Sequence, residues 1–135
     1  MNYLEIDRCS INNGIGIRCV LFVSGCEHKC LGCQNKSSWD KSSGKPFTEQ
    51  TLDYIIEYLK NDYVDGLTLS GGDPLAPYNR EEVFNIAKKI RETNPDFTIA
   101  LGNEIYLTDT REKNQSYHHF ILIAKDAIGH KCLRE

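Results

Sequence analysis

Three cysteines within eight residues, Cys26, Cys30 and Cys33, constrain this chain more than any other feature. Their spacing, C-x3-C-x2-C, lets three thiolates from one tight loop converge on one face of a metal centre. Three thiolates on a four-iron cluster leave one iron without a protein ligand, unlike the four-cysteine sites of electron-transfer ferredoxins. We therefore expect a metal-binding loop that leaves one coordination position open.

A zinc site is the alternative for the same cysteines, with His28 or Cys19 as the fourth ligand, because zinc takes three cysteines plus a histidine, or four cysteines. Closed zinc sites usually draw ligand pairs from two separate segments, and the sequence has no second C-x2-C or H-x3-H pair. The lone cysteines, Cys9, Cys19 and Cys132, are more typical of buried small hydrophobic residues or incidental thiols.

Length and composition predict a single domain, 1–135, because 135 residues fit one ordinary core. The 40% hydrophobic and 26% charged residues are those of a globular protein, and no apolar run approaches the roughly 20 residues of a membrane-spanning helix. Residues 1–8 lack the pattern of a secretory signal. A net charge of -3 gives no general attraction to nucleic acid. We expect a cytoplasmic protein with neither membrane nor nucleic acid as partner, in which six cysteines indicate metal binding or catalysis.

Strands and amphipathic helices alternate along the chain. A β-branched run ends just before the cysteines, Thr48 is a plausible helix N-cap, and Asn79 to Glu82 has capping-box character. The predicted elements are a strand at 18–24, a helix from Thr48 through Leu59, a strand at 67–70, a helix from Asn79 to Asn94-Pro95, and strands at 97–101 and 120–124. This alternation favours an α/β fold with a mainly parallel sheet.

A glycine-rich segment, Ser70-Gly71-Gly72-Asp73-Pro74, follows the second predicted strand. Two consecutive glycines permit a close backbone approach to a ligand, although such a segment alone is more often an ordinary turn. Because the cysteine loop also follows a strand, we expect the two segments to share the edge of the sheet where strands end. The Asp73 carboxylate there would complement an ammonium group.

Together, the cysteine spacing and the glycine-rich segment are similar to the two motifs of the radical S-adenosylmethionine (SAM) superfamily. The resemblance implies a [4Fe-4S] cluster held by Cys26, Cys30 and Cys33, with SAM chelating the open iron and cleaved reductively to methionine and a 5'-deoxyadenosyl radical. Gly72 is the residue most expected to contact SAM through its backbone. The full set of SAM contacts that the resemblance implies is Gly32, Cys33, Gln34, Ser70, Gly71, Gly72 and Asp73.

Flanking residues narrow the resemblance. The segments at 13–19, 21–26, 35–39 and 67–75 resemble those of the activating proteins of anaerobic (class III) ribonucleoside-triphosphate reductases. That family implies a partial radical SAM β/α barrel and a radical SAM oxidoreductase that abstracts hydrogen from one glycine of the reductase large subunit, creating a glycyl radical. It also implies a one-electron donor such as flavodoxin.

The sequence departs from that family at two places. Gln34 stands where a tyrosine commonly follows the third cysteine, so hydrogen bonding to adenine is possible but stacking is lost. Residues 1–97 match the family, whereas 98–135 lack its later motifs and form a shortened or divergent tail. Two alternatives therefore stay open: a radical SAM enzyme acting on a small molecule, and a catalytically degenerate module that binds cluster and SAM.

Three further residues are of types that can act in catalysis, but we expect a structural role for each. His118 and His119 precede an apolar run, a setting more typical of surface or strand-edge residues than of catalysis. Trp39 is expected to pack over the cysteine loop.

Overall fold

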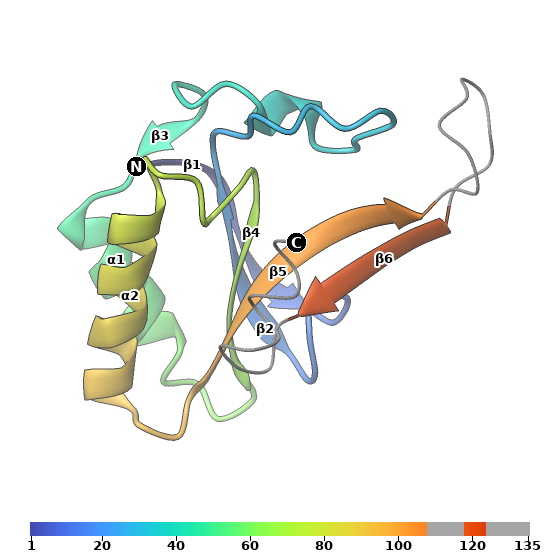
Figure 1. The fold of residues 1–135 in the computed structure, drawn as a ribbon. Helices are drawn as coiled ribbons and strands as arrows, with labels where there is room; N and C mark the ends of the chain where they lie inside the picture. The colour runs from blue at the N-terminus through green and yellow to red at the C-terminus, as the bar shows by residue number, and fades with distance from the viewer. Residues whose placement is uncertain (108–117, 124–135) are drawn as a thin grey trace.

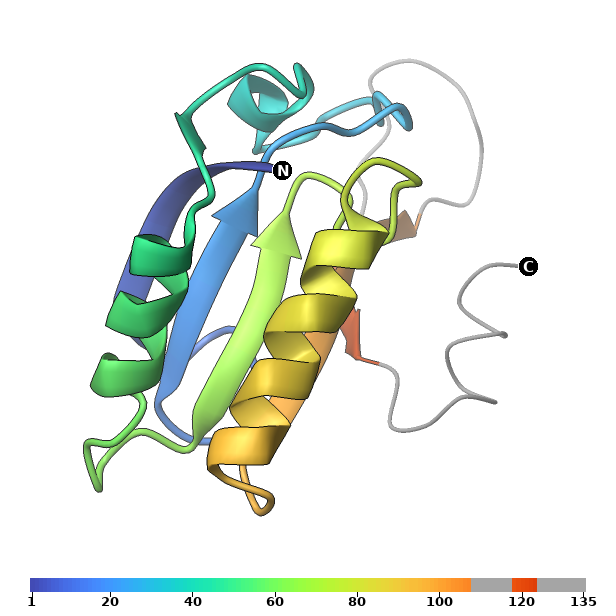
Figure 2. The same ribbon diagram turned by 90° about the vertical axis from the view of Figure 1, so that its left-hand side faces the viewer.

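The computed structural model describes residues 1–107 and 118–123, with side chains described through Leu101. Figure 1 shows a twisted sheet with α1 and α2 on one of its faces, and Figure 2 shows these helices in front of the sheet, with β2 and β4 visible between them. The elements are β1 (Asn2–Ser10), β2 (Arg18–Val23), the short 3-10 helix η1 (Lys36–Ser38), β3 (Lys45–Pro46), α1 (Glu49–Tyr58), β4 (Gly66–Gly71), α2 (Arg80–Thr93), β5 (Thr98–Leu107) and β6 (His118–Ile123).

The strand order in the sheet is β3-β1-β2-β4-β5-β6. β2 pairs with β4 and β4 with β5 in parallel, whereas β1 pairs with β2 and β3, and β5 with β6, in antiparallel fashion. The α/β class is thus confirmed, but the sheet is mixed, and only its three central strands are parallel. The physical reason is the connections: α1 and α2 carry the chain across the sheet between parallel neighbours, while β1 reaches β2 through the short loop 11–17, which permits only antiparallel pairing.

Local sequence signals fix most of these elements. Thr48 caps α1: its hydroxyl accepts from the Thr51 N–H (3.3 Å), and the Thr51 hydroxyl accepts from the Thr48 N–H (3.4 Å). α2 stops at Thr93, before Asn94-Pro95, as predicted. The capping box predicted at Asn79 is wrong, because its side chain makes no cap hydrogen bond to the residues that the structure describes.

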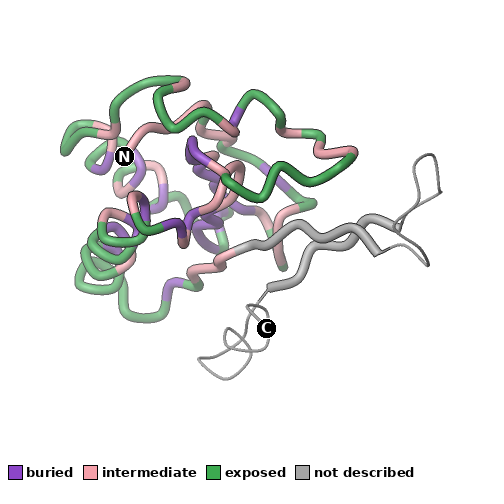
Figure 3. Tube along the Cα trace, turned by 45° about the horizontal axis from the view of Figure 1, so that its top comes forward, coloured by how far each residue is buried: buried purple, intermediate pink, exposed green. Residues whose placement is uncertain are grey.

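The hydrophobic core lies between the sheet and the two helices. Leu21 on β2 and Leu67 and Leu69 on β4 are fully buried there against Ile55 of α1 and Ile86 of α2. These helical residues sit at the spacing that keeps one face inward, so the sequence periodicity translates directly into the packing. Figure 3 shows the result: buried residues gather in the centre, and exposed residues line the outer helix faces and the loops.

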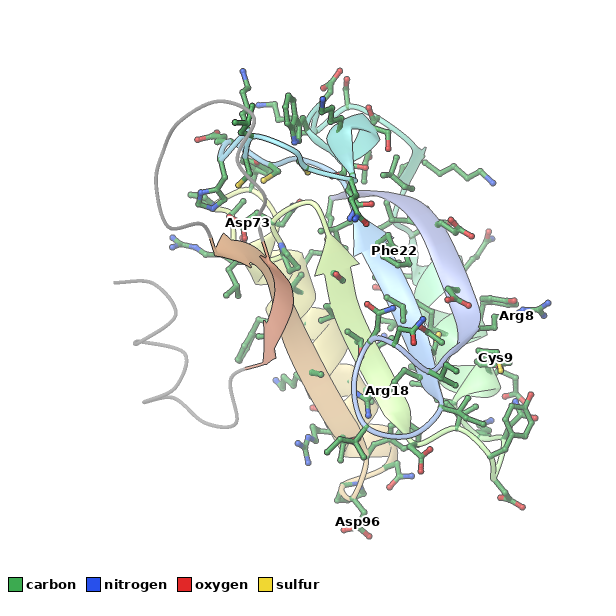
Figure 4. All side chains as sticks on the ribbon, turned by 90° about the vertical axis from the view of Figure 1, so that its right-hand side faces the viewer. Arg8, Cys9, Arg18, Phe22, Asp73 and Asp96 are labelled. Carbon is green, nitrogen blue, oxygen red and sulfur yellow. The ribbon has the colours of Figure 1, made fainter. Side chains whose placement is uncertain are left out.

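Arg18 anchors the amino ends of the parallel strands on the face opposite the helices (Figure 4). It is 3% exposed, and burial lowers the pKa of its guanidinium from the usual value. It donates to the carbonyl oxygens of Leu67 (2.6 Å) and Thr98 (3.0 Å) and to the hydroxyls of Thr68 (3.1 Å) and Thr98 (2.5 Å). Arg18 therefore joins β2, β4 and β5 through oxygen atoms that carry no full charge.

No helix within the described residues is both long and apolar enough to cross a membrane.

Candidate functional site

The cysteine loop and the glycine-rich segment meet at the carboxyl ends of β2 and β4, the edge that the sequence predicts (Figure 2). Val23 and Gly71 are paired at the ends of these strands. Beyond them, the N–H of Gly72 donates to the carbonyl oxygen of Val23 (2.8 Å), and the N–H of Asp73 donates to that of Gly25 (2.8 Å). Two backbone hydrogen bonds thus hold the two motifs side by side.

Glycine is required where these backbones approach each other. Gly71 has φ +99°, and a Cβ there would lie 2.9 Å from Phe22 Cα and from the backbone of Val23. A Cβ on Gly72 would lie 2.5 Å from the carbonyl oxygen of Gly25. Side chains are therefore excluded where Gly71 and Gly72 meet residues 22–25, and backbone atoms form the surface there.

The three cysteines of the loop are free thiols. Cys26 and Cys33 are half-buried and Cys30 is exposed, and Figure 3 shows the loop as a largely exposed stretch. Lys29 (φ +46°) and Gly32 (φ +80°) turn the chain through left-handed conformations between the cysteines. The start of the loop is anchored, because the Cys26 N–H donates to the carbonyl oxygen of Trp39 (3.1 Å).

The donor set fits an iron-sulfur cluster, because three free thiols lie on one accessible loop. In the part of the chain that the structure describes, no three His, Cys, Asp or Glu side chains are gathered closely enough to hold a metal ion. Cys19 is fully buried in the core between sheet and helices, so the alternative of a zinc site with Cys19 as fourth ligand is wrong.

The Asp73 side chain contacts both motifs. Its Oδ1 accepts from the Leu75 N–H (2.9 Å), and its Oδ2 lies 3.4 Å from Nε2 of His28 in the cysteine loop. Burial, and to a smaller extent the Asp73 carboxylate, raises the pKa of the Cys26 thiol, partly offset by the backbone N–H groups of His28 and Lys29. The Cys26 thiol therefore stays protonated to higher pH than an ordinary cysteine, and any metal that it bound would have to displace that proton.

A pocket of about 350 Å³ opens beside Cys26. Trp39 lines it, which agrees with the prediction that this residue packs at the cysteine loop; its Nε1 is buried without a hydrogen-bond partner among the described residues. Burial also raises the pKa of Tyr78 on the pocket wall. The lining residues are Cys26, Glu27, Lys29, Trp39, Asp40, Lys41 and Tyr78.

The remaining residues singled out from the sequence lie in the cysteine loop, in β4 and in β6. Cys33 and Gln34 lie just before η1, with Gln34 exposed, and Ser70 is half-buried near the end of β4. His118 and His119 belong to β6, where they pair with residues of β5, and their side chains are outside the described part, as is Cys132.

Sequence reasoning missed Asn79 as a member of the site. Its side chain is 1% exposed, and Nδ2 donates both to the carbonyl oxygen of Ser24 (2.8 Å) and to that of Asp73 (2.9 Å). The only sequence signal was an asparagine ahead of a helix, which indicates a cap and not a link between loops.

Comparison with known proteins agrees with the resemblance drawn from the motifs. A family profile described as "4Fe-4S single cluster domain" matches residues 12–126. Three relatives each carry the name anaerobic ribonucleoside-triphosphate reductase-activating protein. The one from Enterobacteria phage T4 is 43% identical over 83% of this chain and 72% of its own length, and the one from Vibrio cholerae is 38% identical over 93% and 83%. The one from Escherichia coli K12 is 46% identical over 70% of this chain and 63% of its own length. No solved structure matches.

The coverage and identity of these relatives exceed what a shared cysteine motif alone would produce, and the family profile spans both motif loops. The chain belongs to the family of anaerobic ribonucleoside-triphosphate reductase-activating proteins, enzymes with an iron-sulfur cluster domain.

Proposed function

We propose that this protein is a radical SAM activase that generates a glycyl radical on the large subunit of an anaerobic ribonucleoside-triphosphate reductase. The observation that carries the proposal is the junction of the two motif loops, where Gly72 and Asp73 donate to the carbonyl oxygens of Val23 and Gly25. This junction brings an exposed three-thiol loop beside a side-chain-free backbone surface, which is what a cofactor shared by both loops requires.

Cys26, Cys30 and Cys33 would hold a [4Fe-4S] cluster, and their accessibility supports this assignment. A bound cluster would supply the electron for reductive cleavage of SAM, and SAM would supply the radical that removes hydrogen from the partner's glycine. The chain's own residues would bind and orient: the thiolates would hold the cluster, and the glycine-rich loop beside it would present backbone to the bound SAM.

The glycine-rich loop would bind the methionine end of SAM. Asp73 keeps 22% of its side chain exposed, so its carboxylate can accept from an ammonium group while Oδ1 stays bonded to the Leu75 N–H. The missing side chains at Gly71 and Gly72 allow the backbone to approach the ligand closely. Gly32 and Gln34, on either side of Cys33, and Ser70, which precedes Gly71, would complete the proposed set of contacts.

The finer architecture follows the same proposal. β2, β4 and β5 with their crossover helices would form the first part of an incomplete radical SAM barrel, in a single domain of residues 1–135 whose segment 98–135 is a divergent tail. The names of the relatives support the reductase as partner. A cytoplasmic one-electron donor such as flavodoxin would reduce the cluster.

Anaerobic reconstitution with iron and sulfide, followed by reduction in the presence of SAM, tests the proposal. We expect 5'-deoxyadenosine from the unmodified protein, none from Cys30→Ala, and an unchanged amount from Cys9→Ala, since Cys9 is equally exposed but lies outside the cysteine loop. Addition of the reductase should then give the electron paramagnetic resonance (EPR) signal of a glycyl radical.

Three results would contradict the proposal in different ways. Zinc in place of iron would make this a structural metal site. A loaded four-iron protein that never cleaves SAM would be a degenerate binding module. Cleavage of SAM without radical formation on the reductase would favour a small-molecule substrate.

A further inference from the structure

Asn79 occupies the position before α2 but does not behave as a helix cap. An asparagine there ordinarily accepts a hydrogen bond from the first turn, which stabilises the helix. Within the described residues, the Asn79 side chain makes no such bond, although α2 begins immediately after it. Its amide nitrogen instead donates to the carbonyl oxygens of Ser24 (2.8 Å) and Asp73 (2.9 Å).

These two acceptors belong to the two motif loops. Ser24 is two residues before Cys26, and Asp73 ends the Gly-Gly-Asp segment. The backbone bonds from Gly72 and Asp73 already join the loops directly. Asn79 adds a connection from a third element, the start of α2, because its one side chain is hydrogen-bonded to both loops.

The chemistry of asparagine suits this role. One planar amide nitrogen carries two protons, and both are used here on separate carbonyl oxygens. Aspartate has the same shape but no donor when ionised, and serine has a single donor on a shorter side chain. Since Asn79 is 1% exposed, it cannot contact a ligand and can act only through the two loops.

We propose that Asn79 is a positioning residue that sets the distance between the cysteine loop and the Gly-Gly-Asp loop, and thereby the affinity for SAM. The inference rests on the proposed function, because it takes SAM as the ligand that both loops share.

Asn79→Asp separates this role from helix stability. The substituted carboxylate is as good an N-cap and is favoured at a helix N-terminus, yet it removes both donors and turns oxygens toward two carbonyl groups. We expect the KM for SAM and the Kd of SAM to rise about tenfold, with kcat at saturating SAM within about twofold of the unmodified enzyme. Asn79→Ser, which buries no charge, should show the same direction if the aspartate variant folds poorly.

Hydrogen exchange in the cluster-free protein gives a readout that does not depend on activity. The amides of Gly72 and Asp73 should exchange faster in both variants, because their acceptors are no longer held, while those of Leu67 and Leu69 in β4 should keep their protection.

Asn61→Asp is the matched control. The Asn61 Nδ2 donates to the carbonyl oxygen of Tyr58 (2.6 Å) just after α1, so the same substitution removes a single exposed side-chain bond that joins neither loop. We expect it to leave the KM for SAM and the exchange of Gly72 and Asp73 unchanged.

Folded Asn79 variants with an unchanged KM for SAM and unchanged hydrogen exchange would overturn the inference. A lower kcat and a lower unfolding midpoint with an unchanged KM would also overturn it, because that pattern is typical of an ordinary structural residue. Failure of the unmodified protein to cleave SAM would instead defeat the proposed function. The exchange of Gly72 and Asp73 would then still decide whether Asn79 ties the loops.

Discussion

Gly72→Ala tests how closely the two loops are held. Gly72 is not in the left-handed region, so an alanine meets no backbone penalty, and its effect comes from the space around the added methyl group. The new Cβ would lie 2.5 Å from the carbonyl oxygen of Gly25 and 3.0 Å from that of Val23. Both neighbours are backbone atoms, one at the end of β2 and one two residues beyond it, so neither can rotate away as a side chain would.

The magnitude follows from these distances. Ordinary contact begins at 3.4 Å, so Gly25 and Gly72 must separate by about 0.9 Å. The same Gly25 oxygen accepts from the Asp73 N–H at 2.8 Å, and a comparable stretch would break that bond. Overpacking of this kind costs about 1–3 kcal/mol and a lost hydrogen bond about 1 kcal/mol, so we expect destabilisation of about 3 kcal/mol. In a chain of this size the unfolding midpoint should fall by about 10 °C.

Differential scanning calorimetry of the cluster-free protein measures this shift, and equilibrium binding of SAM to the reconstituted protein measures the effect on the site. We expect SAM affinity to fall along with the midpoint, because the added methyl group lies where both loops meet. A midpoint within about 2 °C of the unmodified protein, with SAM affinity preserved, would refute the reasoning by showing that the loops separate freely.

Three further predictions concern the rest of the molecule. Arg18→Met should destabilise the fold by about 3 kcal/mol in urea titrations, because the buried oxygens of Leu67 and Thr98 lose their donor; a change below about 1 kcal/mol would show that water replaces it. Burial raises the pKa of the Cys19 thiol from its usual 9.0 to about 12, so the unfolded chain loses this proton first and stability should fall as the pH rises from 9 toward 12, by at most about 4 kcal/mol. Guanidinium titrations of Cys19→Ala should lack that component, and an identical pH dependence in the variant would contradict its assignment to Cys19. Protein without metal should keep its circular dichroism and unfold cooperatively, because Cys26, Cys30 and Cys33 lie outside the hydrophobic core; a disordered metal-free chain would contradict this.

Much of the central fold was predictable because local and tertiary preferences agree there. The buried run that forms β2 is apolar and β-branched on both faces, as a central parallel strand requires, and Thr48 caps α1 with its own neighbour Thr51. The meeting of the two motif loops followed from the rule that parallel strands end at one edge. Each of these features depends on nearby residues or on topology alone.

The features that could not be predicted depend on distant partners. The sequence of β1 has no regular alternation of polar and apolar residues, so its pattern does not predict a strand. In the structure, the register between β1 and β2 shifts twice, which accounts for the irregular pattern. That antiparallel strand is one reason why the sheet is mixed. Asn79 shows the same effect on a side chain: its local sequence favours a cap, but two carbonyl oxygens 55 and 6 residues away in the chain take both of its donors.

The two ends of the parallel strands are held by different means, and this difference separates stability from binding. At the amino ends, the Arg18 side chain joins β2, β4 and β5, so the space there is filled (Figure 4). At the carboxyl ends, backbone bonds from Gly72 and Asp73 join the loops, and the buried Asn79 side chain donates to both of them. A ligand can therefore approach bare backbone at the carboxyl edge without displacing a side chain. Arg18→Met should therefore lower the free energy of unfolding and leave the two loops in place, whereas Asn79→Asp should mainly lower the affinity for SAM.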